Sequence, residues 1–210
     1  MINNLIVTIT GFSATGKSTV QKMLDSSGVA VEVLSHTNRP KRGDDDRRIF
    51  VSTEEFQEME KEGRFCQVVE YDGYRYALER ARIQKILETG EVPLLDVSQA
   101  GLQQIVDADL APVLSVFLTA SPAQLKARLL QRKDPDPTVV RRRLNRALAE
   151  AEGINSGAFQ VIQNNDVGET VRKITRLIQG GEVVSDPFDL AQFKKEMVEV
   201  LKSLGKEEEK

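Results

Sequence analysis

Short apolar runs separated by amphipathic stretches make up most of the chain. Runs rich in β-branched residues predict buried strands. They lie at residues 5–10, 29–34, 92–96, 113–118 and 159–163. Apolar residues spaced three and four apart predict helices that cover a sheet. Such stretches lie at residues 80–89, 122–132 and 167–179. Strands that alternate with helices favour a mainly parallel, doubly wound α/β fold.

The middle of the chain follows a different pattern. Residues 35–48 are polar and charged, which is typical of a solvated loop, and the apolar residues 49–51 predict a short strand. The motif STEE opens a predicted capped helix over residues 52–63. Alternating residues around a D-G turn then predict a hairpin over 65–71 and 74–76.

Past residue 180 the pattern changes again, because residues 187–204 predict an amphipathic helix. Its apolar face carries Leu190, Phe193, Met197 and Leu204. A face of this kind has to be covered. We expect it to dock on its own domain or on a second copy of the chain, which would form a homodimer.

Composition and charge narrow the function classes. The chain has 210 residues, 40% of them hydrophobic, and a formal net charge of -3. These values predict one domain with a sizeable core and no global basic field for nucleic acid or membrane. The only cysteine, Cys66, leaves no intrachain disulfide, so the reducing cytoplasm is expected. The only histidine, His36, excludes histidine triads. The sequence shows neither a secretory signal nor an apolar run that could span a membrane.

The strongest chemical signal follows the first predicted strand. The sequence GFSATGKS at residues 11–18 completes the G-x-x-x-x-G-K-[ST] pattern of a P-loop. Its glycines let consecutive N–H groups turn toward one centre, where they and the next helix would hold phosphates. Lys17 would reach the β- and γ-phosphates of ATP, and the Ser18 hydroxyl would hold Mg²⁺. The sequence therefore predicts a phosphate-binding protein.

Two groups of basic residues suit a small polyanion. Arg39 and Arg42 carry planar guanidinium forks that match phosphate oxygens. Residues 132–146 combine a proline-rich breaker with an arginine-rich helix, which would form a mobile lid. A solvated loop and an exposed helix face are the alternative interpretations. Asp96 ends a predicted core strand, where the Mg²⁺ environment of a P-loop enzyme lies.

From about residue 5 to residue 178 these motifs together resemble the guanylate kinases. The sequence SHTNRPKRGD, at residues 35–44, is similar to the family's S-x-T-T-R-x-P-R-x-G-E motif. Further matches are Tyr76 after a D-G turn, R-L-x-x-R at 128–132, Arg143 in R-R-L, and Asn164 in V-I-x-N-x-D. The resemblance implies a P-loop NTPase three-layer fold with a mainly parallel central sheet, a small mixed-β acceptor-binding subdomain and a helical lid.

The resemblance also implies a division of the chain. A guanylate-kinase-like domain would cover residues 1–180, and a helical extension would cover 181–210. The acceptor-binding part would be 35–90 and the lid 132–146. The core would comprise residues 1–34, 91–131 and 147–180.

The P-loop pattern and the family matches together imply the site residues. The implied catalytic residues are Lys17, Arg39, Arg42, Arg132 and Arg143. The implied ATP-binding residues are Gly11, Phe12, Ser13, Ala14, Thr15, Gly16, Lys17, Ser18, Thr19, Arg128, Arg132 and Asn164. The implied acceptor-binding residues are Ser35, Arg39, Arg42, Arg48, Gln67, Tyr76, Asp96 and Ser98. The partners would be small-molecule nucleotides, with ATP as donor and Mg²⁺ held by Ser18.

Several positions depart from the family pattern. Phe12 and Ala14 stand where the family has proline and glycine, and Arg48 replaces a phosphate-binding tyrosine. Gln67 replaces the glutamate that reads guanine, and Ser98 replaces a second acid near the base. A glutamine offers one acceptor and one NH₂ group, which would suit adenine or 2-aminoadenine better than guanine.

The leading hypothesis is a kinase that moves the γ-phosphoryl group of ATP onto a nucleoside monophosphate, similar to GMP or dGMP. One alternative is a ribose 1,5-bisphosphate phosphokinase, whose baseless acceptor fits the lost acids at Gln67 and Ser98. The other is a non-catalytic guanylate-kinase-like interaction module. Such modules typically have a damaged P-loop, whereas Lys17 and Ser18 are intact here.

Overall fold

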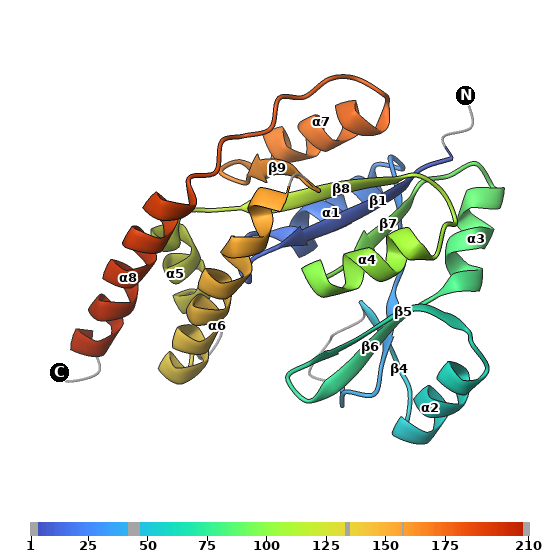
Figure 1. Ribbon diagram of the computed structural model, residues 1–210, viewed down its shortest axis with the longest axis horizontal. Helices are drawn as coiled ribbons and strands as arrows, with labels where there is room; N and C mark the ends of the chain where they lie inside the picture. Colours follow the sequence, from blue (N-terminus) through green and yellow to red (C-terminus); the bar gives the residue numbers. More distant parts are fainter. Residues whose placement is uncertain (1–3, 42–46, 133–134, 157, 208–210) are drawn as a thin grey trace. The chain divides into compact units, whose positions relative to one another are not determined.

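Two compact units make up the chain, and the computed structural model describes residues 4–41, 47–132, 135–156 and 158–207. The first unit comprises Met1–Ile9 and Gln21–Leu114, and the second comprises Thr10–Val20 and Ser115–Lys210. Parallel strands and helices occur in both units (Figure 1). The predicted α/β class with a mainly parallel central sheet is therefore confirmed.

The first unit contains a parallel sheet. The strands β1 (Ile6–Gly11), β7 (Pro93–Asp96) and β2 (Val31–Glu32) pair in the order β2-β7-β1. Leu94 and Leu95 are both fully buried, since the two faces of a parallel sheet are covered. Apolar side chains of β1, β7 and the neighbouring helices form the core of this unit.

The strand predicted over residues 29–34 is wrong in length. The N–H groups of Val29 and Ala30 bond to the carbonyl of Leu24, so these residues complete the end of α1 (Lys17–Ser26). Of the predicted strand only β2 (Val31–Glu32) forms, because the N–H groups of Val29 and Ala30 are already bonded to α1.

A second, four-stranded sheet also belongs to the first unit, and its strand order is β4-β3-β6-β5. The strands are β3 (Ser35–Thr37), β4 (Arg48–Phe50), β5 (Phe65–Tyr71) and β6 (Tyr74–Glu79). β3 pairs parallel with β4 and antiparallel with β6, which confirms a mixed sheet. The turn between β5 and β6 has φ angles of 52° at Asp72 and 76° at Gly73, as a tight hairpin requires.

Two details of this sheet correct the sequence-based prediction. Residues 35–37 are a buried strand and not a solvated loop, because β3 lies between β4 and β6 and its backbone groups pair on both sides. β6 runs on to Glu79, beyond the predicted end at residue 76, because Ala77 and Leu78 continue the ladder with β5.

Three helices accompany the strands of the first unit. They are α2 (Thr53–Lys61), α3 (Arg80–Glu88) and α4 (Gln99–Asp107). The Ser52 hydroxyl caps α2 by accepting a hydrogen bond from the N–H of Glu55, as the STEE motif predicts. The sequence did not predict α4. Only Leu102 and Ile105 are buried apolar side chains in this helix, and the glutamines beside them weaken the helical pattern.

The second unit contains a parallel strand pair and a group of helices. The strands are β8 (Val113–Thr119) and β9 (Gln160–Gln163). The helices are α5 (Pro122–Leu130), α6 (Pro137–Glu150), the 3₁₀ helix η1 (Ala151–Ser156), α7 (Val167–Ile178) and α8 (Leu190–Glu207). α5 begins with a complete capping box formed by Ser121 and Gln124.

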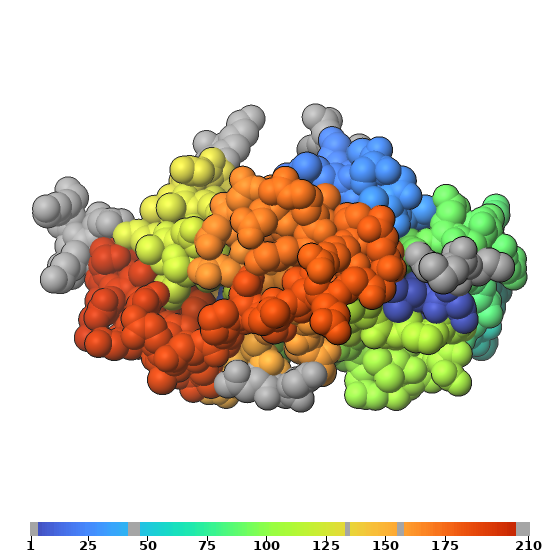
Figure 2. Space-filling view, turned by 90° about the horizontal axis from the view of Figure 1, so that it is seen from above, coloured from blue at the N-terminus to red at the C-terminus, as the bar shows by residue number. Residues whose placement is uncertain are grey.

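The predicted C-terminal helix packs on its own unit. α8 contacts α5 and α6 (Figure 1), and the α8 side chains Phe193, Met197 and Leu204 are at most 5% exposed. In Figure 2 the C-terminal segment, drawn in red, covers part of the surface of this unit. Of the two expected docking partners, the structure therefore favours the chain's own domain. No helix in the described part of the chain is both long and apolar enough to cross a lipid bilayer.

Candidate active site

The P-loop has a backbone that depends on its two glycines. Gly11 has a φ of 150° and Gly16 a φ of 90°. A Cβ at Gly11 would lie 2.4 Å from the carbonyl oxygen of Leu118, and one at Gly16 would lie 2.6 Å from Asn164 Nδ2. Both positions therefore allow close approach as well as an unusual backbone angle. Ala14 also adopts a positive φ, 69°, although it carries a Cβ.

Lys17 and Ser18 stand at the start of α1, directly behind this loop. The Lys17 ammonium donates to the carbonyl oxygens of Gly11 at 2.5 Å and Phe12 at 3.0 Å. The side chains of Ser18 and Thr19 are exposed on the first turn. The start of helix α1, a lysine and exposed hydroxyls are the groups with which P-loops in general bind nucleotide phosphates.

Two predicted ATP-binding residues, Arg128 and Asn164, form hydrogen bonds with the backbone of the P-loop. Arg128 on α5 donates to the carbonyl oxygens of Ala14 and Thr15, both at 3.4 Å, and to that of Asn164 at 2.9 Å. The Asn164 amide donates to the Thr15 carbonyl at 2.6 Å and accepts from the Thr170 hydroxyl at 2.9 Å. Asn164 is 1% exposed, so its amide is fixed by these partners. Both residues shape the loop.

The lid arginines differ in their placement. Arg143 lies on α6, and its guanidinium reaches the Ser13 hydroxyl at 3.4 Å. Arg132 lies just after α5 and is exposed. The structure thus brings Arg143 into contact with the loop.

Glu150 is a charged residue near Lys17 that the sequence motifs did not indicate. It ends α6, two helical turns after Arg143. Burial raises the pKa of its carboxyl group, and the positive charges of Lys17 and Arg146 oppose that rise. In the sequence, Glu150 could have been identified only from its spacing, because two helical turns place it on the same side of the helix as Arg143.

In the first unit, an arginine connects several of the predicted acceptor-binding residues. Arg48 donates to the Ser35 hydroxyl at 3.0 Å, and its guanidinium lies 3.6 Å from the carboxylate of Asp96. The same guanidinium lies 5.6 Å from the centre of the Tyr76 ring. The sheet register explains this arrangement, since Ser35 pairs with Arg48 across β3 and β4. We call these four residues the Arg48 cluster.

Of the two arginines predicted to bind the acceptor phosphate, the structure describes one. The Arg39 guanidinium lies 5.7 Å from the centre of the Phe50 ring, which orients it by a cation–π contact. Its backbone N–H donates to the Thr37 hydroxyl at 3.1 Å. Arg42 lies outside the described residues.

Gln67 and Ser98 both lie next to Gly101, in the first turn of α4. Gln67 is 4% exposed, and a Cβ at Gly101 would lie 2.4 Å from its Nε2 atom. The Ser98 hydroxyl accepts from the Gly101 N–H at 3.1 Å and so caps α4. Ser98 thus has a structural task as the cap of α4, whereas the Gln67 side chain lies against the same turn through its amide end.

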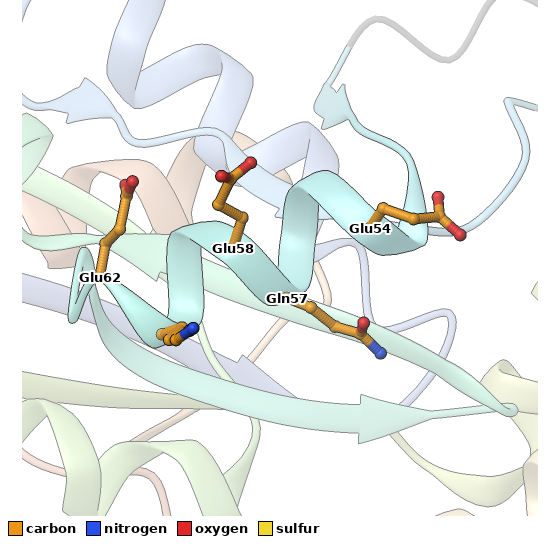
Figure 3. A pocket seen from close by; sticks show the side chains of 5 residues that line it. Glu54, Gln57, Glu58 and Glu62 are labelled. Carbon is orange, nitrogen blue, oxygen red and sulfur yellow. The ribbon is translucent and has the colours of Figure 1, made fainter.

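A shallow depression on α2 contains none of the predicted site residues. Figure 3 shows its lining side chains, which all belong to α2 or the residue after it. They are Glu54, Gln57, Glu58, Lys61 and Glu62. This surface is mostly acidic, so it is the solvated face of a helix and is unsuited to phosphate.

Comparisons with known proteins show the family to which the chain belongs. The guanylate kinase family model matches residues 3–180. The guanylate kinase of Thermus thermophilus is 32% identical over 164 residues, which cover 77% of this chain and 74% of the relative. That of Prochlorococcus marinus is 30% identical over 179 residues, covering 83% and 96%. The crystal structure of guanylate kinase from Anaplasma phagocytophilum has a TM-score of 0.62 at 23% identity, covering 84% of this chain and 85% of that one.

The fold and the P-loop define an enzyme of the nucleoside monophosphate kinase class, which transfers a phosphoryl group from ATP. The chain belongs to the guanylate kinase family. This membership does not favour the ribose bisphosphate phosphokinase or the non-catalytic interaction module. Residues after 180 lie beyond the family match.

Proposed function

We propose that the protein transfers the γ-phosphoryl group of ATP to a 6-oxopurine nucleoside monophosphate, with GMP as the principal acceptor. The observation that carries this proposal is the P-loop, with Lys17 at its helix start and Arg143 in contact with Ser13. The guanylate kinase names of the relatives support the guanine acceptor.

On the donor side, each residue has a distinct proposed task. Lys17 would exchange its bonds to two loop carbonyls for the β- and γ-phosphates, and Arg143 would neutralise charge on the transferred group. The exposed Ser18 hydroxyl would bind Mg²⁺, which neutralises phosphate charge when bound. Arg128 and Asn164 would act by fixing the loop backbone. No covalent intermediate is required, because phosphoryl transfer needs mainly positioning and charge stabilisation.

On the acceptor side, Arg39, Arg42 and Tyr76 are proposed to bind the phosphate, as the family match implies. Arg48 is a further cation, and its contacts to Ser35 and Asp96 connect the proposed phosphate-binding residues with the proposed base-binding ones. Asp96 and Ser35 then remain available to the base through their other lone pairs.

Gln67 is proposed to read the base through its buried amide. Its carbonyl can accept the N1–H of guanine while its NH₂ group donates to O6, an arrangement that leaves the 2-amino group unread. The adenine pairing expected from the sequence uses the same amide with N1 and a neighbouring amino group. Family membership favours the guanine pairing, which hypoxanthine can form equally well.

A steady-state assay of ADP release tests the proposal, with GMP, dGMP, IMP, AMP and ribose 1,5-bisphosphate as acceptors. We expect turnover with GMP, and a GMP to IMP ratio of kcat/KM below about tenfold, since one unread amino group costs little. Turnover with AMP alone would favour the adenine pairing. Turnover with ribose 1,5-bisphosphate alone, or none at all, would overturn the proposal.

The remaining proposals concern partners and location. Small-molecule nucleotides are the proposed partners, and a net charge of -3 gives no reason to expect nucleic acid. The lone cysteine and the nucleotide substrates suit the cytoplasm. A homodimer through α8 would need a surface other than the apolar face that already packs on α5 and α6. Size-exclusion chromatography at several concentrations tests this.

A further inference from the structure

In the second unit, the P-loop packs against the C-terminal extension, and both depart from the family pattern. The P-loop carries Phe12 and Ala14, and an extension follows the last residue of the family match. We propose that the extension, through Phe188 and Phe193, holds Phe12 and thereby keeps the P-loop in its ATP-binding conformation. Phe188 and Phe193 are then positioning residues for the donor nucleotide. This inference rests on the proposed function, because it concerns the same ATP site.

The first observation is an aromatic cluster around the P-loop side chain. Phe12 is 0% exposed. Its ring stacks on that of Phe193, with centroids 5.0 Å apart and an interplanar angle of 24°. Phe188 lies 6.4 Å from Phe12 and 5.3 Å from Phe193. Phe12 and Phe117 form a T-shaped pair with ring centroids 5.2 Å apart. Two of the three aromatic neighbours of Phe12 thus come from the extension.

The second observation is the backbone of Ala14, two residues further along the loop. Its φ of 69° lies in the left-handed region, which a residue with a Cβ adopts only when its surroundings hold it there. Ala14 packs against the same apolar cluster that contains Phe12, Phe193 and Met197. Packing of the extension therefore stabilises a loop conformation that glycine would adopt unaided.

The third observation is that the extension is itself fixed at several points. Near Phe188, the Asp186 N–H donates to the Val161 carbonyl at 2.9 Å, and the Asp186 carboxylate accepts from the Gln163 N–H at 2.7 Å. Lys173 donates to the same carboxylate at 3.0 Å. These bonds attach the segment before α8 to β9 and α7, so Phe188 has little freedom to leave Phe12.

Further along, α8 is tied to the neighbouring helices by polar contacts. Lys194 donates to the carboxylate of Glu152 at 2.6 Å, and Lys126 donates to the hydroxyl of Ser203 at 3.0 Å. An element that is anchored in this way can hold a loop in place. The expected consequence is tighter binding of ATP or ADP, with no direct effect on the acceptor.

The test compares Phe193→Ala with Leu204→Ala in the full-length protein. Leu204 is equally buried on α8, at 3% against 5% exposure, but it lies near the far end of the helix. Isothermal titration calorimetry gives the Kd of Mg·ADP and of GMP for each variant. Because an aromatic pair contributes about 0.5–1.5 kcal/mol, Phe193→Ala should weaken Mg·ADP binding about three- to tenfold. Leu204→Ala should change it less than about twofold, and neither variant should change the Kd of GMP.

A second comparison separates positioning from general stability. Adding Ala14→Gly to Phe193→Ala should restore most of the Mg·ADP affinity, because glycine holds a positive φ without support. Phe12→Ala combined with Phe193→Ala should be no weaker than Phe12→Ala alone. Where Phe193→Ala fails to fold, Phe193→Leu keeps the apolar volume, removes the stacked ring and is measured in the same way.

The outcomes are distinct from those that test the proposed function. An unchanged Kd of Mg·ADP in a folded Phe193 variant, or a loss no greater than that of Leu204→Ala, would overturn the positioning role. Absence of turnover with GMP in a wild-type protein that binds Mg·ADP would overturn the proposed acceptor and leave this inference intact.

Discussion

Single residues of the P-loop carry most of the chemistry proposed for this protein. The Lys17 ammonium is satisfied by two carbonyl oxygens of its own loop, and Glu150 adds a negative charge nearby. Hydrogen bonds to loop carbonyls can be exchanged for bonds to phosphate oxygens, so we expect the side chain to change partners when phosphates bind. Asn164 differs, because its amide is enclosed by bonds to Thr15 and Thr170.

The first prediction concerns Lys17→Met. Loss of the ammonium removes charge stabilisation from the transferred phosphoryl group, so kcat should fall by about a hundredfold or more. The fold should persist, which circular dichroism and the unfolding temperature check. Lys22→Met, which removes an exposed lysine from the same helix, is the matched control and should keep its activity. Near-normal turnover in Lys17→Met would show that the P-loop is not the donor site.

The second prediction concerns Gln67→Glu. A carboxylate accepts hydrogen bonds from both N1–H and the 2-amino group of guanine, whereas hypoxanthine offers only N1–H. The ratio of kcat/KM for GMP over IMP should therefore rise about tenfold or more. The exposed Gln84→Glu adds the same charge on α3 and should leave the ratio unchanged. An unaltered ratio in Gln67→Glu would mean that this side chain does not read the base.

At the scale of elements, helices position the side chains of both sites. α4 is held on β5 by Gln104, whose amide accepts from the Val68 N–H at 2.8 Å and donates to the Val68 carbonyl at 3.0 Å. That contact places Gly101 over Gln67. In the second unit, α6 carries Arg143 and Glu150 along one side, and α8 packs against it.

The third prediction concerns truncation after Gly181. Removing α8 would expose Phe12, Leu129 and Leu144, which the extension helps to bury. The free energy of unfolding should fall by several kcal/mol, at about 25 cal/mol per Å² of apolar surface exposed. Urea denaturation followed by fluorescence or circular dichroism measures this fall. A chain that ends at Leu204 removes only the final polar residues and should unfold like the full protein. Equal stability of both truncations would contradict the packing role of α8.

At the scale of the whole molecule, the sequence predicted the α/β architecture better than the contacts between residues far apart in the chain. Strong local patterns, such as the apolar run of β1 and the Ser52 N-cap of α2, correspond to the observed elements. β3 was missed because Ser35, His36 and Thr37 are polar, and only their place inside a sheet explains their burial. The contact of Phe12 with Phe193 could not be predicted, because no local pattern relates residues so far apart.

The fourth prediction concerns the pH dependence of global stability. Burial lowers the pKa of His36 below its ordinary 6.5, although the nearby Glu79 opposes that shift. The imidazole therefore binds a proton more readily in the unfolded chain than in the folded one. The contribution of neutral His36 to stability is complete above about pH 6.5 and is lost as the pH falls through the folded pKa. His36→Phe should lose less unfolding free energy than wild type between pH 7.5 and pH 5.5. Parallel urea titrations at the two pH values measure the difference, and equal losses would assign the pH dependence to other groups.

The contact between Phe12 and Phe193 also has a consequence for synthesis on the ribosome. Translation delivers the P-loop well before α8, and domains begin to fold while the chain is still emerging. The nascent polypeptide can form its parallel strands before Phe193 leaves the exit tunnel, but the ring that stacks on Phe12 is still missing at that stage. A stalled or prematurely released product would therefore carry an unsupported P-loop. We therefore expect the proposed ATP site to form only after α8 has been synthesised.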